Sequence, residues 1–482
     1  MPGSSISYSD NSYFLKAING VSSLYQFAAN TIFSIPRAFS DTYKIWNNRE
    51  NFIMSELSQR AETSHIAFGD LGLPFSCLPK IVLVTGGRAN ILQVADYGEK
   101  NGDRAARNLF KDVVDMAGAK TIVNMQGSEA AQQRGKLKPH LLGDLSLAIA
   151  SEVSQQVFEK GIKNWDYESS FQDNITHIII NVLGNCVYGI PYVEMKYVPV
   201  VRNAQSLLFE NNAKSAEFIR TKNKMSDMNK ALMTEHAASI FNSENYIKSQ
   251  IELDGTEAEE EKIQMLIDAH GASGFLVEGN LSGITMVAIA YINQSEEIKK
   301  NLQEEIRLHA DKNIRPDAKT LLNKTDFPYL QCIYKEALRF LTPHALLVRQ
   351  TSKPTTLKIK DAWGKSTTYS IPRHSVLFSP IRAIHHDPKY WENPESFNPS
   401  RFLNNAENEH FFPFSLGVRS CPASTGFVEV VFKVMILESM KYDIQLDQQV
   451  EDIAVDTIHA HWKKEYFVND ISCRSESAPR LA

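Results

Sequence analysis

The sequence predicts one large domain that is mainly α-helical and carries a small β-rich part. Residues 271–292 form the most apolar stretch of the chain, which is long enough for a central buried helix. Residues 326–342 repeat apolar side chains every three or four positions, the spacing of one buried helix face. Residues 355–359 and 366–371 are short runs rich in β-branched residues, and the turn residues 361–364 between them predict a hairpin.

The composition is that of a globular protein. The chain has 482 residues, of which 43% are hydrophobic and 22% are charged. A net charge of −5 at pH 7 argues against a nucleic-acid partner. The five cysteines are scattered and odd in number, which predicts a reducing compartment and no disulfide framework.

Residues 1–50 are predicted to be a helical extension in front of the main domain at residues 51–482. The first eleven residues are polar and lack the basic region of a secretory signal. Residues 12–35 are apolar but carry Lys16, Asn19 and Asn30, so they are too polar to span a bilayer. We expect a soluble, cytoplasmic protein without a transmembrane anchor. The extension would pack on the domain, and peripheral contact with a membrane surface is the alternative.

The segment before residue 271 is predicted to be mostly helical. Residues 81–86 indicate a short strand that ends in glycine, and a helix follows from Asn90. Apolar side chains at helical spacing predict helices at residues 145–157 and 175–187, residues 126–141 are helix-like with a basic end, and residues 203–251 are predicted to be helical and polar. The acidic run at residues 257–261 is typical of a solvated helix start.

Residues 271–292 are predicted to be a buried helix rather than a membrane span, because Glu278, Asn280 and four glycines dilute the hydrophobicity. Gly279 and Gly283 are small enough to let a flat cofactor approach the helix backbone.

Residues 326–342 carry start and stop signals of a helix. Asp326 is a candidate N-cap, Pro328 lies in the first turn, and Pro343 ends the pattern. Glu336 and Arg339 are three residues apart and therefore share one helix face. By itself this spacing predicts an ordinary surface ion pair.

Further strands are predicted in the C-terminal third, in the run that carries Arg349, at residues 376–378 and at residues 453–467. The sequence His385-His386-Asp-Pro suggests a metal site, but a packed turn is the better interpretation. His459 and His461 alternate in the last predicted strands without other candidate ligands nearby.

The chain is organised around residues 411–429, which contain Cys421. A helix is predicted from Ala423 to residue 437, directly after the cysteine. A helix N-terminus lowers the pKa of a thiol, which favours a thiolate presented to a metal. Gly417 permits a backbone turn that other residues disfavour, and Arg419 places a fixed cation near the sulfur.

The pattern Phe414-x-x-Gly417-x-Arg419-x-Cys421 resembles the cysteine-ligand loop of the cytochrome P-450 superfamily, whose thiolate binds haem iron. The resemblance implies the cytochrome P-450 fold for residues 51–482, with haem b as cofactor. Cys421 would then be the metal ligand, and Phe414, Gly417, Arg419 and Ala423 would line the cofactor. The family usually has glycine where this chain has Ala423.

The resemblance extends to other residues. It implies that Arg134, Arg349 and, more weakly, His385 lie near haem propionates. The family often has tryptophan or histidine at the position of Ala130, so one such donor is missing. It also implies a buried structural ion-pair core of three residues, Glu336, Arg339 and Arg401.

The reaction implied by the resemblance is a monooxygenation, in which one oxygen atom of O₂ enters an apolar small molecule. The chain departs from the family where an acid and a threonine relay protons, because it has Leu281 and Ser282 there. The candidate catalytic residues are Gly279, Asn280, Ser282 and Gly283.

The pair Gly279-Asn280 resembles family members that rearrange fatty-acid hydroperoxides, such as prostacyclin synthase and allene oxide synthase. A reductant-independent isomerase or dehydratase is therefore an alternative function. A helix-packing role for Asn280 and a non-catalytic haem-binding protein also stay open.

A monooxygenase needs electrons from a separate redox partner. The resemblance places the basic residues Arg134, Lys136, Lys138 and Lys433 on the cysteine side of the haem. They would suit an acidic ferredoxin or flavodoxin. The simplest interpretation of the residues alone is a solvated basic face.

Overall fold

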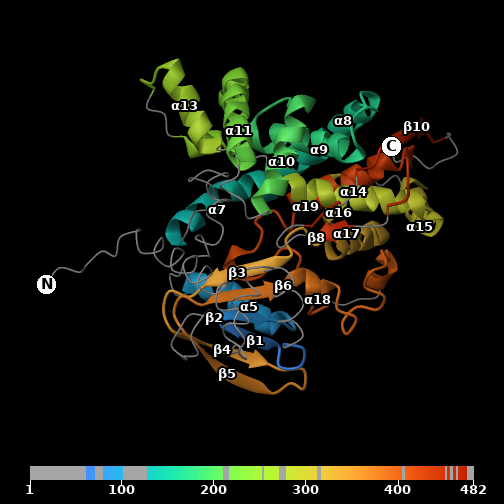
Figure 1. The fold of residues 1–482 in the computed structure, drawn as a ribbon. Coiled ribbons are helices and arrows are strands. Elements are labelled where there is room, and N and C mark those ends of the chain that lie inside the picture. Colours follow the sequence, from blue (N-terminus) through green and yellow to red (C-terminus); the bar gives the residue numbers. More distant parts are fainter. Residues whose placement is uncertain are drawn as a thin grey trace.

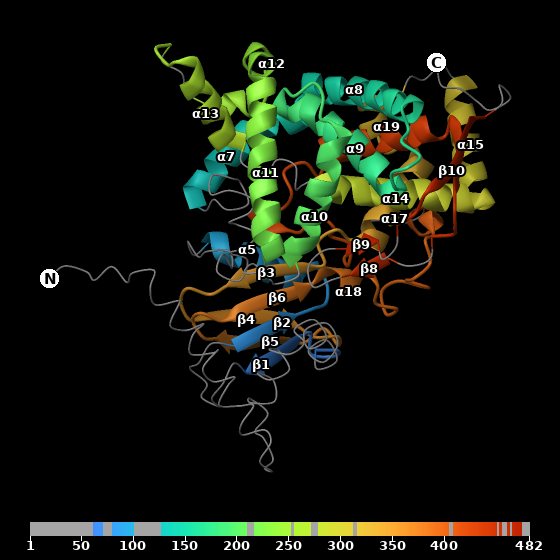
Figure 2. The same cartoon turned by 45° about the horizontal axis from the view of Figure 1, so that its top comes forward.

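The computed structural model describes residues 61–70, 80–100, 127–209, 216–251, 255–270, 278–311, 316–403, 408–450, 453–455, 460–462 and 465–474. A helical part and a smaller β-rich part lie side by side (Figure 1). Figure 2 shows the sheet and the hairpin of β4 (Thr355–Lys360) and β5 (Ser366–Ile371) together on one side of the helices. The predicted fold class, mainly α with a small β-rich part, is confirmed.

The helical part surrounds α14, whose residues 281–290 are all buried. Helices α9, α17 and α19 pack against α14 and supply much of the remaining core. The helices of this part are α7 (Gly127–Leu142), α8 (Asp144–Lys163), α9 (Phe171–Leu183), α10 (Val198–Phe209), α11 (Ala216–Glu235), α12 (Ala237–Asn242), α13 (Glu259–His270), α14 (Glu278–Gln294), α15 (Glu296–Asp311), α16 (Ala318–Leu322), α17 (Pro328–Leu341) and α19 (Phe427–Ser439).

The β-rich part contains a four-stranded sheet in the order β1-β2-β6-β3. These strands are β1 (Ile66–Asp70), β2 (Lys80–Val84), β6 (Val376–Pro380) and β3 (Leu346–Gln350). Strands β2 and β6 are parallel, and the other pairs are antiparallel. Helix α5 (Arg88–Lys100) packs its apolar face on this sheet. The short helix α18 (Ile381–His385) follows β6 directly.

Three two-stranded units complete the fold. The predicted hairpin is confirmed as β4 (Thr355–Lys360) with β5 (Ser366–Ile371). The other pairs are β7 (Tyr442–Leu446) with β10 (Val468–Cys473), and β8 (Ile453–Val455) with β9 (Ala460–Trp462). The strand pair at β8 and β9 confirms the predicted strands of the tail.

Helix α17 forms where the sequence predicts it, but its first turn is satisfied differently. Asp326 is not the N-cap, and Phe327 holds that position without a side-chain hydrogen bond. The carboxylate of Glu305 on α15 instead accepts the N–H groups of Tyr329 at 2.6 Å and Leu330 at 2.9 Å. A neighbouring helix therefore supplies the cap.

The N-terminal extension at residues 1–50 lies outside the described residues, so the predicted domain division stays a prediction. His459 lies outside them as well. Within the described parts of the chain, no helix combines the length and the apolar character needed to cross a membrane.

Candidate functional site

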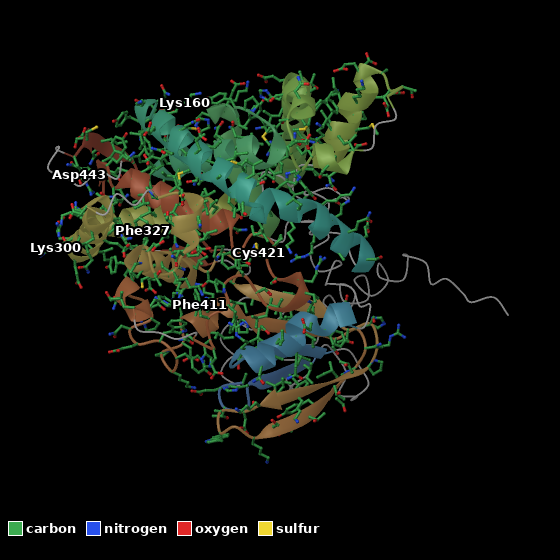
Figure 3. All side chains as sticks on the ribbon, turned by 180° about the vertical axis from the view of Figure 1, so that it is seen from behind. Lys160, Lys300, Phe327, Phe411, Cys421 and Asp443 are labelled. Atoms are coloured by element: carbon green, nitrogen blue, oxygen red, sulfur yellow. The ribbon has the colours of Figure 1, made fainter. Side chains whose placement is uncertain are left out.

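Cys421 lies at the junction between the helical part and the β-rich part (Figure 3). Its backbone N–H donates to the carbonyl of Phe414 at 3.0 Å, which closes the loop on itself. Gly417 has a φ of +73°, and a Cβ there would lie 2.0 Å from Oδ1 of Asp96 on α5. Both the left-handed backbone and the close approach of α5 therefore require glycine at this position.

The helix after the cysteine begins later than predicted. Turns occupy the residues after Cys421, and α19 begins at Phe427 rather than at Ala423. The thiol is therefore not at a helix N-terminus. Burial raises the pKa of Cys421, while the backbone N–H of Ala423 and the charge of Arg134 lower it. A bound metal cation is what would hold this sulfur as a thiolate.

Arg134 on α7 contacts the cysteine loop directly, because its Nη2 donates to the carbonyl of Ser420 at 2.6 Å. Arg134, Phe414, Arg419 and Ala423 are all half-buried around the loop. Ala130, one turn earlier on α7, is buried.

Lys433 does not belong to a basic surface, so its predicted role in partner docking is wrong. The side chain is fully buried in α19. Its Nζ donates to the side chains of Gln331 and Glu429 and to the carbonyl of Leu321. On α7, by contrast, Lys136 is half-buried and Lys138 is exposed.

The polar residues of α14 have different surroundings. Nδ2 of Asn280 lies 3.1 Å from Nε2 of His344, which follows α17. Ser282 and Thr285 are buried, and the hydroxyl of Thr285 donates to the carbonyl of Leu281 at 2.8 Å. His344 carries no signal in the sequence, because a single histidine after Pro343 has no pattern that points to α14.

The two glycines of α14 do not share one environment. A Cβ on Gly283 would lie 2.7 Å from Cδ2 of Leu341 on α17. Its lack of a side chain therefore lets α17 pack closely against α14, and the predicted approach of a flat cofactor stays a prediction. Gly279, one turn earlier, is half-buried.

Arg349 and His385 were predicted to lie near haem propionates, and both side chains form hydrogen bonds with other groups of the protein. The guanidinium of Arg349 is buried and donates to the carbonyls of Ala95 at 3.3 Å and Val348 at 2.8 Å. His385 is fully buried. Its Nδ1 bonds Oγ1 of Thr342 at 2.8 Å, and its Nε2 accepts the N–H of Phe412 at 3.1 Å.

Because both ring nitrogens of His385 are used, the imidazole has no atom left for a propionate. Desolvation is the largest cause that holds the pKa of His385 well below its ordinary value, so the ring is neutral. His385 therefore links α17 to the start of the cysteine loop.

The predicted ion-pair core is present. Glu336 accepts two hydrogen bonds of 2.8 Å from Arg339 and one of 3.2 Å from Nε of Arg401. Glu336 and Arg339 are fully buried. Arg339 also donates to the carbonyl of His385 at 2.9 Å, so the core reaches the segment that precedes the cysteine loop.

Cys421 lies beside two arginines, because Arg134 donates to the carbonyl of Ser420 and Arg419 is two residues before the cysteine. The thiol is half-buried, and burial raises its pKa. A partly exposed thiol beside guanidinium groups is a set of groups that fits a flat anionic cofactor such as haem b. Cys421 would hold its iron, and Arg134 and Arg419 would face its carboxylates.

Comparison with known proteins gives one family. The cytochrome P450 family model matches residues 93–425. Cytochrome P450 93A2 of Glycine max is 36% identical over 114 residues, which are 22% of this chain and 21% of that protein. The 3,9-dihydroxypterocarpan 6A-monooxygenase of Glycine max is 27% identical over 187 residues, 36% of this chain and 34% of that protein.

A third relative is the nicotine N-demethylase CYP82E3 of Nicotiana tomentosiformis. It is 30% identical over 167 residues, 33% of this chain and 30% of that protein. The matched part of the chain thus spans about a third or less of the length of each of these relatives.

Proposed function

The chain belongs to the cytochrome P450 family, and we propose that it is a haem-thiolate monooxygenase that inserts one oxygen atom of O₂ into an apolar small molecule. Proteins of this family bind haem b through a cysteine thiolate. The observation that carries the proposal is the position of Cys421, a half-buried thiol in a loop that is closed by the Phe414–Cys421 hydrogen bond and contacted by Arg134. The names of two relatives, a monooxygenase and an N-demethylase, support the reaction type.

The residues of this chain have distinct roles in the proposal. When bound, haem b would supply the iron at which dioxygen is activated. Cys421 would hold that iron, and Arg134 and Arg419 would fix the carboxylates. The buried core of Glu336, Arg339 and Arg401 would keep the loop rigid, so that the sulfur stays in place.

The test is the spectrum of the reduced protein under carbon monoxide. Haem-loaded protein should show the red-shifted Soret band of a thiolate-ligated haem, and Cys421→Ala should lose it. Cys473→Ala is the matched control, because Cys473 is exposed on β10 and should keep the band. A band at the position of histidine-ligated haem, or a red-shifted band that survives in Cys421→Ala, would disprove the assignment.

A second candidate is a reductant-independent isomerase or dehydratase of fatty-acid hydroperoxides. It is favoured by Asn280 and by the lack of an acid and threonine pair, since Thr285 is bonded to its own helix. The test mixes a polyunsaturated hydroperoxide with haem-loaded protein without reductant. Fast consumption that collapses in Asn280→Ala would support this candidate, and consumption indifferent to Asn280 would leave the monooxygenase.

For the monooxygenase we propose an acidic ferredoxin- or flavodoxin-type donor that docks beside α7. Arg134 contacts the cysteine loop, and Lys138 is exposed on the same helix. Lys136→Glu with Lys138→Glu should slow reduction steeply at low salt. Lys300→Glu is the control, because Lys300 is exposed and lies away from Cys421 (Figure 3). Equal rates for the double variant and the control at every ionic strength would exclude this surface.

A further inference from the structure

The β4–β5 hairpin lies at the edge of the β-rich part, away from the helical part (Figure 1). The apolar side chains on its inner side, Leu357, Ile359 and Ile371, are buried in the core of the β-rich part. Lys358 and Lys360 alternate with them along β4 and are exposed. The period of the strand therefore turns these lysines outward.

The hairpin and its flanks are basic, although the whole chain has a net charge of −5. Asp361 is the only acidic residue between residues 353 and 373. Five exposed basic side chains form what we call the basic surface: Lys353, Lys358, Lys360, Lys365 and Arg373. None of them pairs with a carboxylate among the residues that the structure describes. Their charge is therefore available to an anionic partner.

Trp363 lies in the turn at the tip of the hairpin and is 76% exposed, the largest fraction among the exposed large apolar side chains of the described residues. Oδ1 of Asp361 accepts the N–H groups of Trp363 at 3.0 Å and Lys365 at 2.8 Å. The N–H of Ala362 donates to the carbonyl of Thr63 at 3.0 Å, which ties the tip to the segment before β1. The backbone of the tip is thus fixed, and it presents the indole next to the basic surface.

Hydroxyl groups lie among the cations. Ser366 is paired with Lys360 in the ladder, so its exposed hydroxyl shares the outward face of that lysine. Thr368 is placed in the same way opposite Lys358. Lysine ammonium groups and hydroxyls can both donate hydrogen bonds to phosphate oxygens.

This combination matches the chemistry of an anionic membrane surface. Tryptophan is favoured at the level of the lipid head groups, because its ring is apolar and its N–H is polar. Lysine and arginine side chains near an anionic leaflet are attracted to its surface charge. A protein partner would need a pocket shaped for the indole, whereas a layer of head groups admits the ring without one.

We propose that the β4–β5 hairpin docks on an anionic phospholipid surface, with Trp363 entering the head-group layer and the basic surface facing the lipid phosphates. The docking uses none of the residues around Cys421, so it stands apart from the proposed function.

The test is flotation of the haem-loaded protein with two kinds of vesicle, phosphatidylcholine alone and an equimolar mixture of phosphatidylcholine and phosphatidylserine. We expect the protein to float with the mixed vesicles and to be released by added salt, because the attraction is screened. Replacing Lys358, Lys360 and Lys365 by glutamine should weaken binding by about fivefold for each charge removed.

A second triple variant is the matched control for charge. It replaces three exposed lysines of the helical part by glutamine and so changes the net charge equally: Lys300, Lys319 and Lys324. Its binding should stay close to that of the unaltered protein.

The indole is tested by Trp363→Ser, which should weaken binding to the mixed vesicles by about tenfold, because the apolar ring no longer leaves water. Leu145→Ser is the matched control. Leu145 is also a large apolar side chain, is 75% exposed on α8 and lies outside the hairpin, so its replacement should leave binding unchanged.

Two outcomes would overturn the proposal. Failure of the unaltered protein to float with the mixed vesicles would refute docking on lipid and leave a protein as the partner of the basic surface. Binding that the hairpin variants weaken no more than their controls would place the contact elsewhere on the chain. The carbon monoxide spectrum of the same samples reports the haem-thiolate site separately, so failure of this inference and failure of the proposed function are distinguishable.

Discussion

Replacing Glu336 by glutamine keeps the size of the side chain and removes its charge. The carboxylate accepts four hydrogen bonds. Its Oε1 accepts from Nη2 of Arg339, Nε of Arg401 and the N–H of Asn398, and its Oε2 accepts from Nε of Arg339. A glutamine would keep three of these hydrogen bonds if its side-chain oxygen took the Oε1 position. Its NH₂ would then face Nε of Arg339, donor against donor.

The size of the effect follows from burial. Arg339 is fully buried, so without the carboxylate its guanidinium stays inside the protein with no counter-charge. Breaking a buried pair by removing one partner costs about 3–5 kcal/mol. That is a large part of the stability of an ordinary domain. We therefore expect the free energy of unfolding of Glu336→Gln to fall by about 3–5 kcal/mol.

The assay is urea unfolding followed by circular dichroism, with the retained haem measured in the same samples. The matched control is Glu304→Gln on α15. Glu304 and Arg307 are also three residues apart and also share two hydrogen bonds, but both are solvent-exposed. Water already solvates these charges, so the control should change stability little. Equal losses in the two variants would refute the reasoning from burial.

Three further outcomes are expected. Gly417→Ala should lower the haem content and the free energy of unfolding. The left-handed backbone alone costs about 1–2 kcal/mol, and the loss should be larger because the new Cβ would also meet Asp96. Gly135→Ala on α7 is the control and should be neutral or stabilising, because nothing lies within 4 Å of that Cβ. Lys433→Met should cost about 1–3 kcal/mol in urea unfolding because buried acceptors lose their donor; an unchanged midpoint would contradict the buried network. His385 is neutral when folded, so its contribution is complete above the ordinary histidine pKa near 6.5 and is lost as pH falls below it. Between pH 6 and 5 the free energy of unfolding of His385→Gln should therefore fall less steeply than that of the unaltered protein. The two slopes should differ by up to about 1.4 kcal/mol per pH unit, and parallel curves would contradict this.

Much of the site could be predicted because its signals are local. The pattern from Phe414 to Cys421 marks the cysteine loop by its spacing alone, and a hydrogen bond between these two residues closes this loop. Glu336 and Arg339 are one helical turn apart, so their pairing follows from the helix period. The β4–β5 hairpin likewise follows from alternation and turn residues within one short segment.

The start of helix α19 and the N-cap of α17 were both predicted wrongly from local sequence. Both predictions used the nearest residues in the chain. The turns after Cys421 delay α19 to Phe427, and the first turn of α17 is capped by Glu305 from α15 rather than by Asp326. A helix end needs partners for its N–H groups, and a neighbouring helix can supply them as well as the local sequence can.

The sequence by itself determined the fold class, the cysteine loop and the ion pair of α17, because each is encoded by spacing within a few turns of chain. Only the tertiary structure decided which side of an element faces inward. It buried Lys433, bonded both nitrogens of His385, set Gly283 against Leu341 and brought His344 to Asn280. These outcomes depend on contacts between residues far apart in the chain, and side-chain burial and pKa follow from the packing of whole elements rather than from local periodicity.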